Sequence, residues 1–179
     1  KRKFNMEEIE KQQKIQMCRH SLSHVLAKAI KNVFGKENVK LAIGPAIDNG
    51  FYYDFDMESI TPEKFADIEK EMKAIINKNE EYKRVELSRE QALELFKHEP
   101  YKIELINDLP ANETISCYYL GDDFIDLCRG PHVENTSKLQ SYAYKINRVS
   151  GAYWRGNEKN KMLQRIYVYA FPGKKQLNE

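Results

Sequence analysis

Apolar residues recur with the spacing of a helix over the first part of the chain. Asn5 followed three residues later by Glu8 has the form of a capping box, and Gly35 is the kind of residue that ends a helix. We therefore predict a helix over residues 6–34. Its apolar stripe consists of Leu22, Val25, Leu26, Ala29, Ile30 and Val33.

Two shorter helices are predicted further along the chain. One begins at Thr61-Pro62-Glu63, where proline is accepted in the first turn, and Ser88 with Gln91 caps the other, which extends through residue 97. The stretch 101–106 fits a strand or a helix, and its pattern does not decide between them. The first of these helices has a buried face made of Phe65, Ile68, Met72, Ile75 and Ile76.

Other segments have the composition and alternation of strands. Residues 39–47 read as a strand with a break at Gly44-Pro45, and Asn49-Gly50 is a turn signal before a strand over 51–56. Residues 82–87 resemble an edge strand, and 114–120 pairs with 124–128 across Gly121. Three more strands are expected near 142–149, 151–155 and 163–171. The whole pattern predicts an α+β fold, with helices packed on a mostly antiparallel sheet.

Composition agrees with one packed domain over residues 1–179. The chain is 41% apolar and 31% charged, with a mean hydropathy of −0.71. No run approaches the roughly 18 apolar residues of a membrane span, and the first residues lack the apolar core of a signal peptide. Three cysteines are too few for a disulfide framework, which favours an intracellular setting. Because the chain does not begin with methionine, we expect it to be a fragment of a longer protein.

The net charge of +2 conceals an uneven distribution. Between Thr136 and Asn178, nine lysines and arginines, Lys145 and Arg148 among them, stand against one acid, Glu158. Tyrosines and the tryptophan are interleaved with these cations. Cations attract phosphates and aromatic rings stack on unpaired bases, so this segment is a candidate RNA-binding surface. A solvated basic face with aromatics packed in the core explains the same pattern.

Histidine and cysteine form two pairs with the same spacing. His20 and His24 are four residues apart, and so are Cys128 and His132. Positions i and i+4 of a helix project to one side, here opposite the centre of the apolar stripe, so the first pair faces either water or a cleft. The remaining histidine, His98, follows the helix over 88–97, where a cation interacts with the helix dipole.

These pairs allow four interpretations. They are a plausible zinc set, or a metal-free hydrolytic site in which imidazole moves protons and the thiol holds the substrate. They also fit a nucleophilic Cys128 paired with a histidine, or a buried cysteine and surface histidines with no shared role. Spacing alone does not rank them. Because the phosphate-binding glycine motifs and the serine nucleophile elbow are missing, the sequence gives no case for ATP, NAD or a serine hydrolase.

Several stretches taken together identify a family. They are residues 19–24 (RHSLSH), 43–45 (IGP), 49–54 (NGFYYD), 126–132 (DLCRGPH), 151–156 (GAYWRG) and 162–167 (MLQRIY). This combination resembles the N-terminal editing domain of bacterial-type threonyl-tRNA synthetases over nearly the whole chain. The two four-residue spacings are shared with alanyl-tRNA editing proteins, whereas the YWRG and LQRIY stretches look like the threonyl branch.

The resemblance implies an activity. A domain of this kind hydrolyses the ester of mischarged Ser-tRNA(Thr), without a metal or other cofactor, in the cytoplasm and away from membranes. Its partners are that tRNA and the rest of the synthetase chain. The synthetic and anticodon-binding domains of such a chain have no counterpart here. The fragment itself is therefore not expected to charge tRNA. Two alternatives stay open, namely a non-catalytic RNA-binding module and a zinc-dependent deacylase of another aminoacyl-tRNA such as Ala-tRNA.

The resemblance also implies roles for particular residues. His20 and Lys102 are the candidates for placing and activating water, with Lys102 as a base or as a stabiliser of the oxyanion. His24, Cys128 and His132 line the pocket and orient the ester and the adenosine. For the seryl ammonium and hydroxyl groups the candidates are Asp126 and Tyr53.

Overall fold

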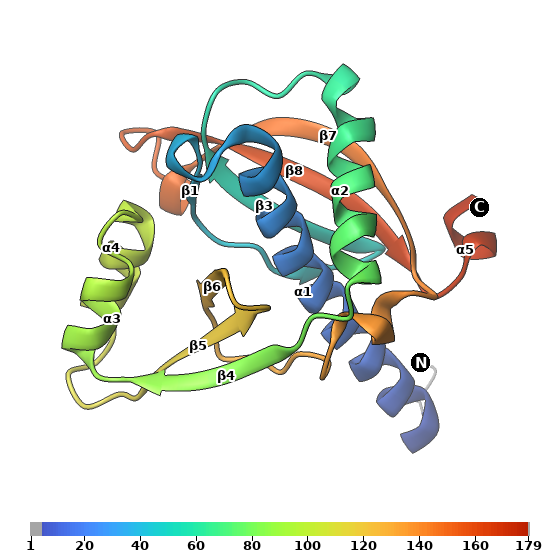
Figure 1. The fold of residues 1–179 in the computed structure, drawn as a ribbon, viewed down its shortest axis with the longest axis horizontal. Coiled ribbons are helices and arrows are strands. Elements are labelled where there is room, and N and C mark those ends of the chain that lie inside the picture. The colour runs from blue at the N-terminus through green and yellow to red at the C-terminus, as the bar shows by residue number, and fades with distance from the viewer. Residues whose placement is uncertain (1–4, 179) are drawn as a thin grey trace.

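The computed structural model describes residues 5–178, in which the strands form two antiparallel sheets. A five-stranded sheet has the order β1-β3-β8-β7, with β2 also paired to β3, and a three-stranded sheet has the order β4-β5-β6. The α+β class is therefore confirmed, but the expected mostly antiparallel sheet is two separate sheets. Figure 1 shows α1 and α2 on one face of the larger sheet, with the smaller sheet beyond α1.

Helix α1 (Met6–Phe34) has the bounds that its capping signals predict. The Asn5 side chain accepts a hydrogen bond from the Glu8 backbone N–H at 2.8 Å, and Gly35 caps the other end with a φ of 94°. Every residue from 21 to 30 is buried, including His24 and Lys28 on the side opposite the apolar stripe. The side opposite the stripe therefore faces a protein interior rather than water.

The five-stranded sheet differs from the expected strands in two places. Residues 39–47 are not one strand but two short ones, β1 (Lys40–Leu41) and β2 (Ala46–Ile47), because the chain leaves the regular ladder around Gly44-Pro45. The two strands expected at 142–149 and 151–155 are one, β7 (Ala143–Tyr153), with an irregularity between Ile146 and Arg148. Strands β3 (Gly50–Asp56) and β8 (Met162–Phe171) complete this sheet.

The three-stranded sheet consists of β4 (Tyr82–Leu87), β5 (Ile115–Leu120) and β6 (Phe124–Leu127). Gly121, with a φ of 68°, forms the hairpin turn between the last two strands. Two helices pack against this sheet, α3 (Arg89–Leu95) with its capping box of Ser88 and Gln91, and α4 (Pro100–Asp108). The stretch 101–106, which the sequence left open, is therefore helical.

The remaining elements complete the two layers. Helix α2 (Phe65–Asn77) follows a 3-10 turn over Pro62–Lys64, and its residues Ile68, Met72, Ile75 and Ile76 join the main core, as predicted. Other 3-10 turns are Lys36–Asn38, Thr136–Leu139 and Trp154–Gly156, and α5 (Lys174–Asn178) is one short turn. None of the helices between residues 5 and 178 combines the length and apolar composition that a membrane span requires.

Candidate active site

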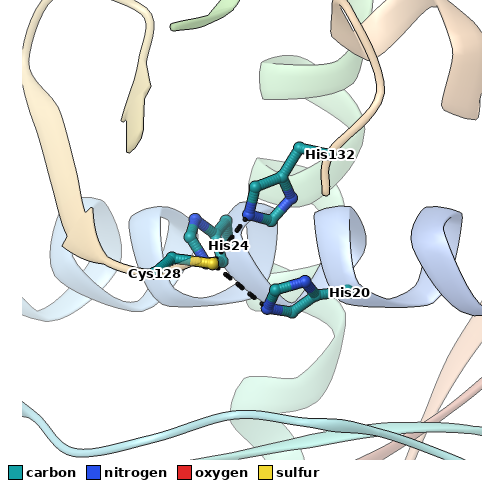
Figure 2. Close-up of side chains that lie close together, drawn as sticks. All are labelled: His20, His24, Cys128 and His132. Carbon is teal, nitrogen blue, oxygen red and sulfur yellow. Dashed lines mark hydrogen bonds between the residues drawn. The ribbon is translucent and has the colours of Figure 1, made fainter. Parts of the chain in front are cut away.

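The two pairs of histidine and cysteine meet between α1 and the turn that follows β6. His20 and His24 project from α1, and Cys128 and His132 approach them from the other side (Figure 2). The rings of His20 and His132 are stacked with centroids 4.4 Å apart, and the ring of His24 lies 4.3 Å from that of His132. Residues more than a hundred positions apart thus form one cluster.

Hydrogen bonds run through this cluster in one direction. The Oγ of Ser21 accepts from the Val133 backbone N–H at 3.1 Å and lies 3.0 Å from Nδ1 of His132. Because this hydroxyl is fully buried and has no other hydrogen-bond partner among the described residues, we assign its proton to the contact with that nitrogen. With Nδ1 accepting, Nε2 of His132 carries the ring proton and donates to Sγ of Cys128 at 3.2 Å. The same sulfur lies 3.5 Å from Nε2 of His20. This assignment makes the Cys128 thiol the donor and Nε2 of His20 the acceptor.

The second nitrogen of His20 supports this assignment. The backbone of Pro131 raises the pKa of His20 against the larger effect of burial, and because proline has no N–H, its carbonyl is the group that favours a proton on the imidazole. Since Nε2 faces the thiol, Nδ1 is the nitrogen on which this carbonyl favours the proton. Nε2 of His20 therefore carries a lone pair that is directed into the site, as a general base requires.

Burial keeps the members of this cluster neutral. It lowers the pKa of His20, lowers the pKa of His24 well below the ordinary value, and also lowers the pKa of His132, where the two other imidazoles add to the effect. Burial raises the pKa of the Cys128 thiol to about 12. Because only a thiolate is strongly nucleophilic, these shifts count against the interpretation of Cys128 as a nucleophile.

A second polar group forms the floor of the site. Nζ of Lys102 lies 2.6 Å from Oδ1 of Asp126, and Oδ2 of Asp126 accepts from the Tyr53 hydroxyl at 2.6 Å. Burial and the neighbouring carboxylate raise the pKa of Tyr53 well above its ordinary value. His24 lies next to this group, with its Nε2 3.6 Å from Oδ2 of Asp126. The floor thus connects α4, β6 and β3 to the histidine cluster.

The Lys102 ammonium contacts three oxygen atoms of the protein. It forms an ion pair with Oδ1 of Asp126, which accepts no hydrogen bond of suitable geometry, and it donates to the Ala42 carbonyl and, at 3.2 Å, to the Tyr53 hydroxyl. The contact to Tyr53 is the longest of the three, so it is the one that Lys102 gives up most readily to reach a substrate oxygen. In contrast, Nδ1 of His24 has no hydrogen-bond partner among the described residues although it is buried.

Both polar groups contribute to the lining of one cavity of about 280 Å³, although His132, which was expected to line it, is not among the lining residues. This volume is at the small end for ligand sites, which suits an aminoacyl group better than a whole nucleotide. Gly44 is required in its wall, because a Cβ there would lie 2.1 Å from the Tyr53 ring. The cavity is lined by His20, His24, Ile43, Gly44, Pro45, Tyr53, Lys102, Asp126, Leu127, Cys128, Arg129 and Gly130.

The residues predicted to bind tRNA lie outside this cavity, on the face of the five-stranded sheet away from the core. Lys145 is exposed and lies opposite Tyr169 in the ladder between β7 and β8. In the ladder between β8 and β3, Tyr169 lies opposite Gly50. The Arg148 guanidinium lies 4.0 Å from the centroid of the Tyr167 ring. Neither cation forms an ion pair with any residue between 5 and 178, so both are available to phosphates.

Other cations of the basic segment are already neutralised. Arg165 forms an ion pair with Asp54 at 2.8 Å, and Lys161 forms one with Asp56 at 2.9 Å. Arg155 contacts acids of α4. These three cations therefore pair with acidic residues of the same chain and are not free to bind phosphates. His98 is exposed and lies outside the histidine cluster, as expected.

Ser21 is a site residue that the sequence reasoning missed. Its side chain is fully buried and fixes the orientation of His132. A single serine within a helix has no characteristic spacing. The one available signal is its position beside Leu22 in a buried stretch, where a hydroxyl without a partner is costly. The Ala42 carbonyl was missed for another reason, since residues 39–47 were expected to be one strand.

The four clustered side chains also have the geometry of a metal site. His20, His24, Cys128 and His132 each offer one ligand atom, and these atoms all lie within 4.8 Å of one another. Two or three imidazoles with a thiolate are a common zinc set. Because the pKa of Cys128 is raised to about 12, zinc would have to displace the proton of this thiol in order to bind.

Comparison with known proteins bears on this site directly. The family described as "Threonyl and Alanyl tRNA synthetase second additional domain" matches residues 115–167, which include Asp126, Cys128 and His132. The chain is 56% identical over 160 residues to the threonine--tRNA ligase of Clostridium perfringens (strain SM101 / Type A), which is 89% of this chain and 24% of that protein.

Two further threonine--tRNA ligases give the same result. The protein of Desulforamulus reducens is 58% identical over 164 residues, covering 90% of this chain and 25% of its own length. The protein of Halalkalibacterium halodurans is 53% identical over 173 residues, covering 95% of this chain and 26% of its own length. The chain thus spans about a quarter of the length of these relatives. Over the residues that these matches cover, it belongs to the threonyl-tRNA synthetase family and contains the second additional domain.

Proposed function

We propose that residues 1–179 form a single tRNA-editing domain that hydrolyses the ester of Ser-tRNA(Thr), releasing serine and tRNA(Thr). The observation that carries this proposal is the neutral His20, whose Nε2 faces a small cavity with the Lys102–Asp126–Tyr53 group at its floor. Such a domain acts as part of a synthetase chain in the cytoplasm, and the synthetic and anticodon-binding functions belong to other parts of that chain.

A chemical limit explains why such an activity is needed. Serine is threonine without one methyl group, and a missing methyl changes binding by only about 1–3 kcal/mol. A synthetic site for threonine therefore accepts some serine. A second cavity that is too small for the extra methyl, or in which the methyl displaces the attacking water, removes the wrong product.

The reaction needs one proton acceptor and one group that stabilises negative charge. Nε2 of His20 accepts a proton from water as the oxygen attacks the ester carbonyl, because its contact to Cys128 at 3.5 Å is long enough to be replaced by water. Lys102 turns one donor from the Tyr53 hydroxyl to the developing oxyanion. The proton on His20 then passes to the 3′ oxygen of the adenosine as the ester bond breaks.

The other members of the site hold these two groups in place. Asp126 and Tyr53 fix Lys102 and present oxygen atoms to the seryl ammonium and hydroxyl groups. His132 and Cys128 fix the neutral form of His20, while Nδ1 of His24 is buried without a partner among the described residues. In this proposal the site works without a metal, and the Cys128 thiol, whose pKa burial raises to about 12, keeps its proton.

A deacylation assay with three substrates tests the proposal. Purified chain should release serine from Ser-tRNA(Thr) and leave Thr-tRNA(Thr) and Ala-tRNA(Ala) largely intact. Equal rates on Ser-tRNA(Thr) and Thr-tRNA(Thr) at saturating enzyme would contradict the specificity. Turnover of Ala-tRNA(Ala) alone would support an alanyl deacylase instead, and tRNA binding without turnover would support an RNA-binding module.

A further inference from the structure

A groove of about 750 Å³ adjoins the catalytic cavity along α1. The groove and the cavity share His20, Pro45 and Gly130 as lining residues, so they lie side by side at these residues. The remaining lining residues are Gln13, Lys14, Gln16, Met17, Ala46 and Pro131.

The groove follows a single face of α1. Gln13, Met17, His20 and His24 recur at intervals of three or four residues, so they lie along one side of the helix. The seven steps from Gln13 to His20 correspond to about 10 Å of helix, at about 1.5 Å per residue. Successive nucleotides of a stacked strand are about 3.4 Å apart, so this length admits at least one nucleotide beyond a unit bound at His20.

The chemistry of the groove suits a nucleotide. Met17, Pro45, Ala46 and Pro131 supply apolar surface for the face of a base, and the amides of Gln13 and Gln16 are both donors and acceptors for its edge. Lys14 is exposed and adds a positive charge, and the groove lining contains no acidic residue among those described. A phosphodiester therefore meets attraction here without a competing carboxylate.

We propose that this groove binds the cytidine that precedes the terminal adenosine, with Lys14 on the phosphate that joins them. The inference rests on the proposed function, since it assumes that the cavity takes the seryl end of a tRNA. With the ester at His20, the chain of the tRNA leaves through the shared residues and continues along α1 toward Gln13. The subsite holds the 3′ end of the tRNA along α1. A substrate that contains this phosphate therefore binds more tightly than seryl-adenosine alone.

Two non-hydrolysable analogues measure the subsite without turnover. In both, an amide replaces the ester of 3′-seryl-adenosine, and one of them carries the additional 5′ cytidylyl phosphate. Calorimetric titration of the wild-type chain should show about tenfold tighter binding of the longer analogue, the scale of one stacked base and one exposed phosphate contact.

Lysines of the same helix provide the test and its control. Lys14→Ala should weaken binding of the longer analogue about fivefold, lower its log–log salt slope by about 0.7, and leave the shorter analogue unchanged. Lys14→Arg should retain most of the wild-type affinity. Lys11 is the matched control, because it is exposed on the same helix but about 180° from His20, and Lys11→Ala should bind both analogues as the wild type does.

Three results would overturn the subsite. They are equal affinity of the wild type for both analogues, the same loss for both analogues in Lys14→Ala, and binding of neither analogue by the folded chain. The expected binding pattern in a chain that leaves Ser-tRNA(Thr) intact would uphold the subsite and contradict the proposed hydrolysis.

Discussion

Nζ of Lys102 lies 2.6 Å from Oδ1 of Asp126 at a position where both side chains are only 2% exposed. The pair links α4 to β6 across the floor of the cavity. Two charges taken out of water stabilise each other only while both are present, so each residue depends on the other for stability as well as for function.

Removing one member of this pair should therefore cost both stability and activity. Lys102→Ala leaves a buried carboxylate without its cation, and we expect a loss of about 3–5 kcal/mol in the free energy of unfolding. The deacylation rate should fall roughly 10²-fold, the scale of a lost oxyanion donor. The double variant Lys102→Met/Asp126→Asn should recover much of the stability but not the rate. Urea denaturation and single-turnover deacylation measure the two effects, and recovery of both would show that Lys102 is only structural.

His20→Ala should lose roughly 10²-fold or more in the rate of Ser-tRNA(Thr) deacylation, because it removes the general base. Single-turnover rates at saturating enzyme give this value independently of tRNA affinity. His98→Ala is the matched control, since His98 is exposed and outside the cluster, and it should stay within a few-fold of the wild type. A loss in His98→Ala as large as that in His20→Ala would place the active site elsewhere.

Stability should decrease as the pH falls below about 6.5. In the unfolded chain each histidine takes up a proton near that pH, whereas burial lowers the pKa of His20, His24 and His132 in the folded chain. The unfolded state thus binds more protons below pH 6.5, and each buried histidine contributes up to about 1.4 kcal/mol of destabilisation per pH unit. Above pH 6.5 both states are neutral at these positions and the effect disappears.

Denaturation in urea at pH 7.5, 6.5 and 5.5 measures this dependence. His132→Asn should reduce the slope below pH 6.5. A slope that His132→Asn leaves unchanged would mean that His132 is protonated in the folded chain.

Activity should persist after removal of metal ions. The clustered ligand atoms lie within 4.8 Å of one another, but the thiol among them is held protonated by burial. We therefore expect no change in the deacylation rate after dialysis against EDTA. Stoichiometric zinc in the purified chain, together with activity that is lost on chelation and restored by zinc, would contradict this prediction.

Reversing the free cations on the sheet should weaken tRNA binding. Lys145→Glu/Arg148→Glu should lower affinity for tRNA(Thr) and flatten its salt dependence, because each lost phosphate contact reduces the log–log slope by about 0.7–0.9. Hydrolysis of a seryl-adenosine mimic without phosphates should scarcely change. Lys159→Glu provides the control, since this exposed lysine lies in the turn at the opposite end of β7 and β8. Equal tRNA affinity in all three proteins, with circular dichroism unchanged, would place the tRNA elsewhere.

Local signals predicted most of the fold. Capping residues such as Asn5 and Gly35 act within one turn of the helix that they bound, so the sequence contains them. The division into two sheets could not be predicted in the same way, because it depends on which strands pair across long distances. The break after Leu41 and the continuity of β7 through its irregularity likewise depend on neighbouring strands.

The site was predictable in its composition but not in its connections. The spacing of His20 and His24, and of Cys128 and His132, indicated two pairs, and the family resemblance added Lys102. The sequence did not show that Lys102 contacts Asp126, Tyr53 and Ala42, or that Ser21 orients His132. Those contacts join elements from both sheets and from α1, and only the folded structure brings them together.

The site takes its members from α1, β3, α4, β6 and the turn after β6, so no contiguous part of the chain contains it. During synthesis, His20 and His24 on α1 emerge more than a hundred residues before Cys128 and His132, which complete the cluster. If the proposed function is correct, a nascent chain has no deacylase activity until the segment with Cys128 and His132 has docked on α1. For the same reason the deacylation rate serves as a reporter of the cooperatively folded population in refolding experiments.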